Sequence, residues 1–108
     1  MASPPWWLYM IRTRAGTIYT GITTDVDRRF RQHATGRGSR YLRARGPATI
    51  LLRQRIGPRS LAAKLEYQVK RLDRRHKELI VAAGRLRFSR TSGRLSALFA
   101  GGQPPIGY

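Results

Sequence analysis

The chain has 108 residues, the length of one small domain, and a hydrophobic content of 41% allows only a modest core. It contains no cysteine, which excludes disulfides and zinc–thiolate sites, and no apolar run approaches the roughly 20 residues that span a bilayer. Its 22 basic and 5 acidic residues give a formal net charge of +17, and a field of that sign attracts polyanions. The composition therefore predicts nucleic acid as the partner and no membrane.

Two segments with the character of β-strands open the chain. Residues 6–12 are aromatic and apolar, and residues 17–23 are rich in β-branched and aromatic side chains. The segment Arg14-Ala15-Gly16 between them is typical of a turn, because Gly16 can adopt a positive φ. We therefore predict an N-terminal β-hairpin.

A helix is predicted directly after the hairpin. Thr24 or Asp25 can cap its first turn, and Gly36 and Gly38 are expected to end it. The helix follows the second strand closely, so we expect it to pack on the sheet.

One strand and two helices are predicted in the second half of the chain. Residues 49–53 are apolar without alternation, which indicates a strand buried on both faces. Ser60 is expected to cap a helix that runs to about Leu72, and Asp73 a further helix that runs to Ala83. The order β-β-α-β-α-α predicts an α+β fold, in which a small three-stranded antiparallel sheet is flanked by helices.

The chain divides into a domain and a tail. Residues 5–83 carry the predicted elements and form the expected domain. Residues 84–108 are rich in glycine, serine, proline and arginine and show little periodicity. We predict that they form a basic, mobile C-terminal tail.

The length of the hairpin loop decides whether Tyr9 and Tyr19 share a face. Side chains alternate along a strand, so a loop of two residues would place the two tyrosines on opposite faces. A loop with an odd number of residues sets Tyr9 opposite Gly21 and Tyr19 opposite Ile11, which brings both tyrosines to one face. We predict the odd loop, because a shared site requires it, and expect Gly21 to leave space for a phosphate beside Tyr9.

Each of the other candidate site residues has an ordinary structural explanation when taken singly. A lone histidine on a helix is usually a surface residue, and the default interpretation of Glu66 is an ion pair with a nearby arginine. Arg29 and His33, however, lie four residues apart and share a helix face beside Val26 and Phe30. This placement at the edge of the core makes the set more informative than its members.

The segment WLYMIRTRAGTIYTGITTDVDRRFRQH resembles the signature of GIY-YIG nucleases. Trp7-Leu8-Tyr9 stands at the first triplet and Tyr19-Thr20-Gly21 at the second, while Arg29 and His33 match the R-x-x-x-H helix of the family. The segment LEYQVKRL resembles the helix that carries the metal-binding glutamate, here Glu66. The resemblance covers residues 6–83 and is to the short, stand-alone bacterial members. Two features depart from the pattern. The first triplet lacks glycine and isoleucine, and the chain contains no asparagine, although the larger family places one after the glutamate helix.

This resemblance implies a metal-dependent endonuclease that hydrolyses DNA phosphodiester bonds, with one Mg²⁺ or Mn²⁺ held by Glu66. It implies that Tyr9 acts as general base or positions the water, and that His33 assists it. Tyr19 would hydrogen-bond a phosphate oxygen, and Arg29 would stabilise the developing charge. The family implies DNA repair or recombination as the setting. Single-stranded or branched DNA is the substrate that would make best use of the aromatic residue Tyr41, and the absence of cysteine fits the bacterial cytoplasm, with association with the nucleoid as an option.

A basic loop follows the first helix. Its arginines surround one aromatic residue, a composition that suits contact with a nucleic-acid backbone and stacking on an exposed base, although a solvated loop explains it equally well. The residues predicted to bind nucleic acid are Arg28, Arg37, Arg40, Tyr41, Arg43, Arg45 and Lys70.

The charge alone supports two other classes of protein. One is a non-catalytic, basic nucleic-acid-binding module with the same fold, and the other is a ribosome-associated protein. A glutamate among the clustered candidates favours the enzyme, because binding alone has no need of Glu66. We expect DNA as the partner, with RNA as the alternative, and a monomer in preference to an oligomer.

Overall fold

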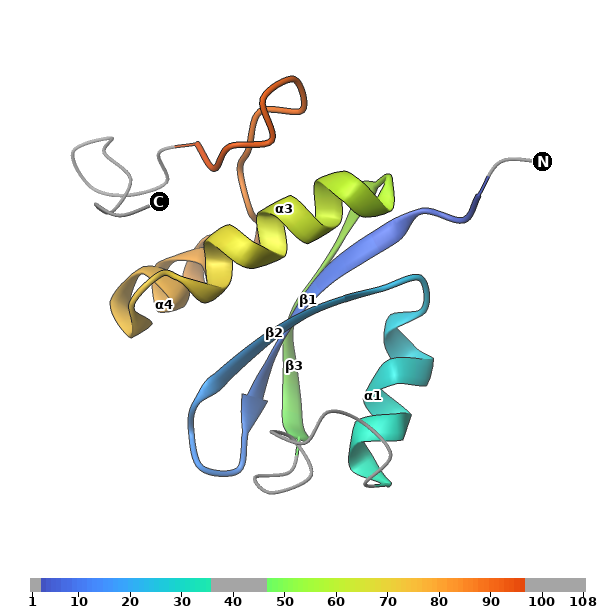
Figure 1. The fold of residues 1–108 in the computed structure, drawn as a ribbon. Helices are drawn as coiled ribbons and strands as arrows, with labels where there is room; N and C mark the ends of the chain where they lie inside the picture. Colours follow the sequence, from blue (N-terminus) through green and yellow to red (C-terminus); the bar gives the residue numbers. More distant parts are fainter. Residues whose placement is uncertain (1–2, 36–46, 97–108) are drawn as a thin grey trace.

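A three-stranded antiparallel sheet forms the centre of the computed structural model, which describes residues 3–35 and 47–96 (Figure 1). The strands lie in the order β2-β1-β3, so β1 is the central strand. In chain order, the elements are β1 (Trp6–Thr13), β2 (Ile18–Thr23), α1 (Val26–Ala34), β3 (Pro47–Gly57), α3 (Arg59–Lys70) and α4 (Arg74–Ala83). The predicted α+β architecture and element order are confirmed.

The loop between β1 and β2 has the predicted odd register. The Gly16 N–H donates to the Thr13 carbonyl at 2.9 Å, and Gly16 adopts a φ of 88° in the turn. Tyr9 consequently pairs with Gly21, and Tyr19 pairs with Ile11 two positions further along β1. Because side chains alternate along each strand, Tyr9 and Tyr19 lie on the same face of the sheet, as predicted.

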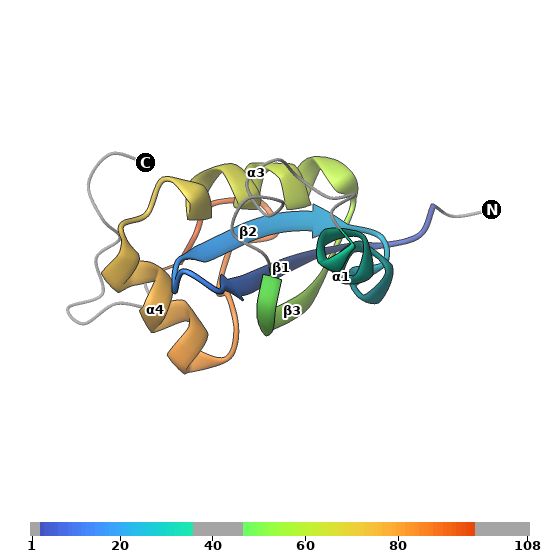
Figure 2. The same ribbon diagram turned by 90° about the horizontal axis from the view of Figure 1, so that it is seen from below.

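Each face of the sheet has its own apolar cluster. On one face, α1 contributes Val26 to a cluster with Tyr9 and Ile11. On the other face, α3 and α4 cover the larger cluster, formed by Leu8, Met10, Leu52, Ile56, Ala62, Leu65, Val69, Leu72, Ile80, Leu86 and Leu95. Figure 2 shows α3 running along the sheet, with α1 apart from it. The two tyrosines therefore lie on the opposite face from the main core.

Strand β3 is longer than the predicted strand at residues 49–53, because it extends from Pro47 to Gly57. Its apolar residues pack on both faces, as predicted: Ile50 contacts the smaller cluster and Leu52 belongs to the larger one. The extra length comes from a second half that alternates, in which arginines face solvent and Ile56 is buried. An alternating pattern suits an edge strand, which is the position of β3 in the sheet.

Two acidic residues cap helices as the sequence predicts. A side-chain oxygen of Asp25 accepts from the Arg28 N–H at 3.1 Å at the start of α1. Asp73 accepts from the His76 N–H at 2.9 Å at the start of α4, which ends at Gly84 in the left-handed region. Each cap satisfies a backbone donor that the first helical turn leaves without a partner.

The predicted ends of helix α3 are wrong by about two residues. Helix α3 begins at Arg59 after Pro58, and Ser60 does not cap it. Proline cannot donate but fixes an extended approach to the helix, so the chain enters α3 without a side-chain cap. Helix α1 ends at Ala34, before the glycines predicted to stop it, which lie outside the described residues. Within residues 3–35 and 47–96, no helix is long and apolar enough to cross a membrane.

Residues 85–96 pack on the domain, although the sequence predicts a mobile tail from residue 84. Leu86 and Leu95 are 2% and 7% exposed and belong to the main core. The Gln54 side chain fixes this segment, accepting from the Leu86 N–H at 2.7 Å and donating to its carbonyl at 2.9 Å. Single leucines in an arginine-rich segment have no periodicity, so their burial left no pattern to detect. The rest of the predicted tail, 97–108, lies outside the described residues.

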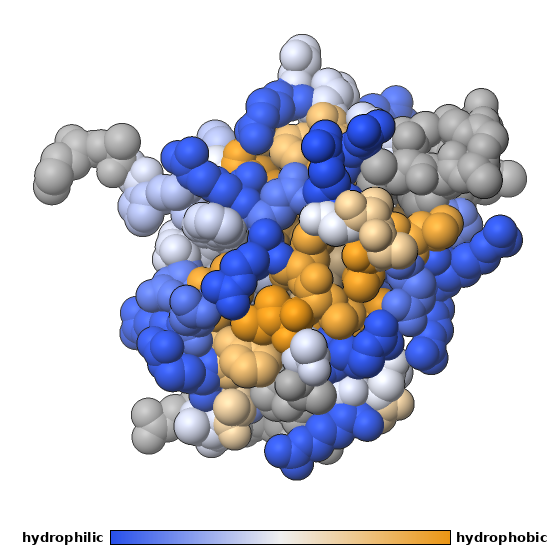
Figure 3. Space-filling view, turned by 180° about the vertical axis from the view of Figure 1, so that it is seen from behind, coloured by the Kyte–Doolittle hydropathy of each residue, from blue (hydrophilic) through white to orange (hydrophobic). Residues whose placement is uncertain are grey.

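Hydrophobic side chains also reach the surface. Seen from behind, they gather at the centre of the molecule and are surrounded by hydrophilic side chains (Figure 3). Among the described residues, large apolar side chains counted as exposed are Tyr67 and Leu79, at 62% and 37%. On the face that Figure 3 shows, hydrophilic side chains therefore surround a partly apolar centre.

Candidate active site

Tyr9 lies at the centre of the candidate site and is buried beside His33. The two residues are 2% and 1% exposed, and the Tyr9 hydroxyl lies 3.2 Å from Nε2 of His33. The central strand β1 supplies Tyr9 and the helix α1 supplies His33, so the packing of α1 on the sheet fixes both ends of this hydrogen bond. The contact is enclosed by protein and shielded from bulk water.

Burial keeps both groups of this pair uncharged. It raises the pKa of Tyr9 well above its ordinary value, with a further rise from Tyr19 and partial opposition from Arg29. It also lowers the pKa of His33 to about 4, and the positive charge of Arg29 adds to that fall. At neutral pH the phenol and the imidazole are therefore both neutral.

Tyr19 and Arg29 complete the cluster around this pair. The ring centroid of Tyr19 lies 6.2 Å from that of Tyr9 and 5.7 Å from that of His33. Arg29 donates from Nη1 to Oε1 of Gln32 at 3.0 Å, which holds its guanidinium on this side of α1. The structure thus brings four of the five predicted site residues together from three elements. Gln32 was absent from the sequence prediction, although its position three residues after Arg29 was a usable signal.

Gly21 provides room for Tyr9 itself, and the expectation that it leaves space for a phosphate is wrong. A Cβ atom added to Gly21 would overlap Oη and Cζ of Tyr9. The buried tyrosine ring lies flat over the glycine of the neighbouring strand and fills that position.

Gly21→Ala is expected to destabilise the protein by about 1–3 kcal/mol, the usual cost of overpacking a core. The cause is steric, because Tyr9 is too enclosed to move away from the added methyl group. Chemical denaturation measures the change. A Tyr9→Leu background should remove most of the effect of Gly21→Ala, and additive effects in the double variant would contradict the overlap.

Glu66 lies on α3, which packs on the face of the sheet opposite to Tyr9 and Tyr19. Its Oε2 lies 3.3 Å from Nζ of Lys70 one turn later, and the Glu66 side chain is 23% exposed. The same Lys70 ammonium lies 5.7 Å from the ring centroid of Tyr19. Lys70 therefore lies between the Glu66 carboxylate and the Tyr19 ring, and its predicted contact with nucleic acid stays a prediction.

The donor set fits one weakly held divalent cation. No group of three or more His, Cys, Asp or Glu side chains that could hold a metal is found in residues 3–35 and 47–96. Mg²⁺ nevertheless binds through one or two carboxylates, completing its coordination with water and substrate phosphate oxygens. Glu66 can supply that carboxylate, because its partner Lys70 is about half exposed and free to turn away. The buried Thr20 hydroxyl, which lacks a hydrogen-bond partner, lies on the face opposite to Tyr19, the same face that α3 covers.

The remaining predicted contacts are only partly described by the structure. Arg28 is exposed on α1, next to the residues of the cluster. The predicted loop residues Arg37, Arg40, Tyr41, Arg43 and Arg45 lie outside the described residues.

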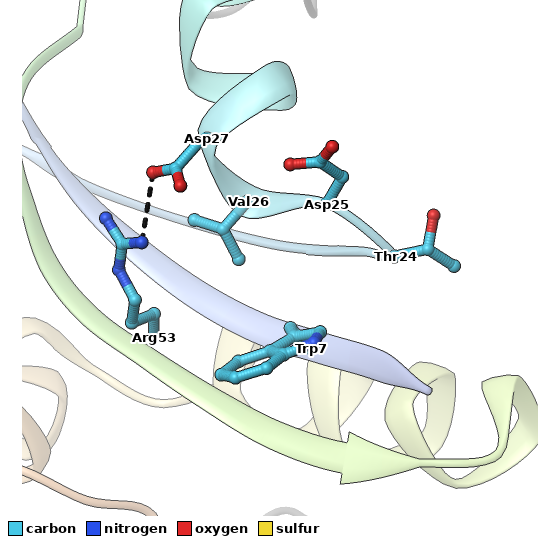
Figure 4. A pocket seen from close by; sticks show the side chains of 6 residues that line it. All are labelled: Trp7, Thr24, Asp25, Val26, Asp27 and Arg53. Carbon is cyan, nitrogen blue, oxygen red and sulfur yellow. Dashed lines mark hydrogen bonds and ion pairs between the residues drawn. The ribbon is translucent and has the colours of Figure 1, made fainter. Parts of the chain in front are cut away.

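A pocket of about 290 Å³ lies at the start of α1, beside the cluster (Figure 4). Two of its lining residues, Trp7 and Val26, pack in the same apolar cluster as Tyr9. Its polar side holds an ion pair between Arg53 and Asp27 at 3.0 Å. The charged lining of this pocket therefore consists of two carboxylates, of Asp25 and Asp27, and one arginine.

The comparison with known families agrees with this geometry. Residues 5–79 match the GIY-YIG catalytic domain, which is more than half of the chain. The chain therefore belongs to the GIY-YIG family, whose fold is of the nuclease type and implies a nucleic-acid substrate. The resemblance noted in the sequence is confirmed.

Its relatives belong to a stand-alone group named UPF0213. The UPF0213 protein YhbQ of Escherichia coli K12 is 51% identical over 80 residues, which is 74% of this chain and 80% of that protein. A UPF0213 protein of Citrobacter koseri is 50% identical over 80 residues, with the same coverage. A solution NMR structure of a UPF0213 protein from Bacillus halodurans shares 41% identity and a TM-score of 0.48, covering 72% of this chain and 83% of that one.

Proposed function

We propose that this protein is a metal-dependent endonuclease that hydrolyses phosphodiester bonds of DNA. The observation that carries the proposal is the convergence of two tyrosines, an arginine and a buried neutral histidine from β1, β2 and α1. A binding surface has no need of a tyrosine–histidine pair shielded from water. Membership of a family with a nuclease-type fold supports the same function.

The Tyr9–His33 pair provides a route for a proton. Neutral His33 can accept the Tyr9 proton at Nε2, across the 3.2 Å contact, while the Tyr9 oxygen takes a proton from the attacking water. The water then becomes the nucleophile, and the positive charge formed on His33 faces the negative charge growing on the phosphate. The low pKa of His33 and the raised pKa of Tyr9 oppose this transfer in the free protein, so the proposed transfer depends on the negative charge that develops on the bound phosphate.

Arg29 and Tyr19 would hold the phosphate beside this pair. The planar guanidinium of Arg29 matches two phosphate oxygens, and the Tyr19 hydroxyl can donate to a third. A divalent cation, held by Glu66 when bound, supplies charge neutralisation and Lewis acidity at the phosphate. The exposed Lys70 would release Glu66 for this role.

Cleavage of labelled substrates tests the proposal. Purified protein is incubated with single-stranded, duplex and branched DNA and with RNA, each with Mg²⁺, Mn²⁺ or EDTA. We expect cutting of DNA that requires the metal and stops with EDTA. Cutting of RNA alone would change the substrate class, and binding of every substrate without cutting would contradict the enzyme.

Arg29→Lys is expected to slow cleavage by roughly 10- to 100-fold, because an ammonium cannot reproduce the bidentate contact of a guanidinium. The fold should be unchanged, since Arg29 is only partly buried. Arg31→Lys is the matched control, because Arg31 lies on the same helix but is exposed and outside the cluster. Single-turnover rates for the two variants measure the effect, and equal rates would remove Arg29 from the site.

One observation favours a second candidate function, a non-catalytic nucleic-acid-binding module. Glu66 is engaged with Lys70, and no three-ligand metal group is found in the described part of the chain. In such a module the ion pair would be permanent and metal would have no effect on the nucleic acid. The cleavage assay with and without EDTA separates the two candidates.

A further inference from the structure

Three neighbouring cavities, here called the track, share lining residues and involve the N-terminal segment, the end of β3, the first half of α3 and residues 85–96. The first, of about 580 Å³, is lined by residues 3–6 together with the end of β3 and the start of α3. The second, of about 350 Å³, shares Pro58 with the first, and the third, of about 360 Å³, shares Arg90 with the second. These shared residues connect the N-terminal segment to residues 85–96.

The lining of this track is basic throughout. Its charged side chains are Arg55, Arg59, Lys64, Arg85, Arg87 and Arg90. No carboxylate stands among the described residues that line the three cavities, whereas the pocket at the start of α1 contains two. The track therefore concentrates positive charge and has no internal anion to neutralise it.

Two arginines of the track are held over aromatic rings. The guanidinium of Arg59 lies 5.2 Å from the ring centroid of Trp6, and that of Arg90 lies 5.1 Å from the ring centroid of Phe88. Arg90 also donates from Nη1 to the Ile56 carbonyl at 2.7 Å. Ordered guanidinium groups lose less conformational entropy on binding a phosphodiester than flexible ones, and the neighbouring rings can stack on bases.

The track is separate from the tyrosine cluster. Trp6 packs against the main core, on the face of the sheet opposite to Tyr9 and Tyr19. Residues 85–96, which form its far end, lie beyond the matched family domain at residues 5–79. A ligand in the track would therefore contact a surface that the family match does not include.

We propose that this track binds the sugar–phosphate backbone of nucleic acid at a second position, away from the tyrosine cluster. Arginine forks match phosphodiester oxygens, and a connected row of cavities suits a linear polyanion better than a flat anionic surface. The binding requires nucleic acid as the partner but does not require cleavage. It holds one segment of the nucleic acid while another occupies the tyrosine cluster.

The test compares two double variants with equal charge loss. Arg59→Gln/Arg87→Gln removes one arginine from each end of the track, and both side chains are exposed. Arg14→Gln/Arg75→Gln removes two exposed arginines from the hairpin loop and from α4, outside the track. Equilibrium binding to labelled DNA is measured in EDTA at several salt concentrations, so that no cleavage is involved, and thermal unfolding checks that both variants are folded.

We expect the track variant to bind DNA about 10-fold more weakly or worse. The slope of the logarithm of the binding constant against the logarithm of the salt concentration should become shallower by roughly 0.9 for each of about two lost phosphate contacts on duplex DNA. The control should lose less than about threefold. Equal losses in the two variants would reduce the effect to net charge and overturn the proposal. Unchanged DNA binding in the track variant, with loss of binding to anionic vesicles, would assign the track to a membrane surface instead.

A fluorescence experiment checks the location directly. The chain has two tryptophans, so Trp7→Phe leaves Trp6 as the reporter at the start of the track. Bases that stack near Trp6 should quench its emission when DNA binds, and the quenching should be lost when Arg59→Gln/Arg87→Gln is added. Quenching that persists in the combined variant, or is absent throughout, would place the DNA elsewhere.

Discussion

Glu66→Gln is expected to lower the metal-dependent rate of DNA cleavage by at least about 100-fold. Loss of an outer-sphere partner of a metal ligand already costs 10–100-fold, and this substitution removes the proposed ligand charge itself. The fold should persist, because the Glu66–Lys70 ion pair is partly exposed and pairs of this kind contribute at most about 1 kcal/mol. Single-turnover cleavage at saturating Mg²⁺ measures the change.

The chain provides a matched control for this variant in its other glutamate. Glu78 pairs with Arg12 at 2.9 Å near the hairpin loop, where Arg12 also donates to the Gly16 carbonyl. Glu78→Gln should retain the cleavage rate, while Glu66→Gln should retain DNA binding. Cleavage by Glu66→Gln at the rate of the unmodified protein would assign the activity to a contaminant or to other residues.

The protein is expected to lose about 3 kcal/mol of stability as the pH falls from about 6.5 to 4, through His33 alone. The folded state holds the pKa of His33 at about 4, below the 6.5 of an unfolded histidine, so the unfolded state takes up the proton first. The stability is fully present above pH 6.5 and decreases by 1.36 kcal/mol for each pH unit on the way down. Urea denaturation between neutral pH and about pH 4.5 measures this slope.

The two histidines of the chain allow the slope to be assigned. His33→Gln should be less stable at neutral pH, because it disturbs a buried contact, but its stability should vary much less with pH. His76→Gln should keep the slope. Asp73 and Glu78 contribute only at the acidic end. The pKa of Asp73 is lowered chiefly by the backbone N–H of His76, which His76→Gln retains, and that of Glu78 by Arg12. An equal slope in His33→Gln would contradict a neutral buried imidazole.

The register of the hairpin could be predicted from sequence because a chemical requirement selected one of two discrete options. Strand alternation leaves Tyr9 and Tyr19 either on one face or on two, and the loop Arg14-Ala15-Gly16 fits the first. The spacing of Arg29 and His33 works in the same way, since a helix turn fixes which residues share a face. The alternation of side chains along a strand and the repeat of a helix turn can therefore both be used to predict shared faces from sequence alone.

Which side chain fills a given space could not be predicted from the sequence in the same way. Gly21 was expected to leave a gap, but whether Tyr9 lies over it depends on a rotamer and on packing by α1. The link between Glu66 and Tyr19 likewise depends on where Lys70 reaches. The cavities near residues 85–96 depend on contacts between segments distant in sequence, such as Gln54 with Leu86.

The packing of residues 85–96 changes where this domain ends. The family match stops at residue 79, and a boundary drawn from helix periodicity stops at residue 83. A fragment cut at either point would lack Leu86 and Leu95 and would open the sheet face beneath α3 and α4 to water. Such a fragment would expose an apolar surface to solvent and would therefore be prone to self-association. The smallest soluble unit for expression or for fusion to other domains should therefore extend at least to residue 96.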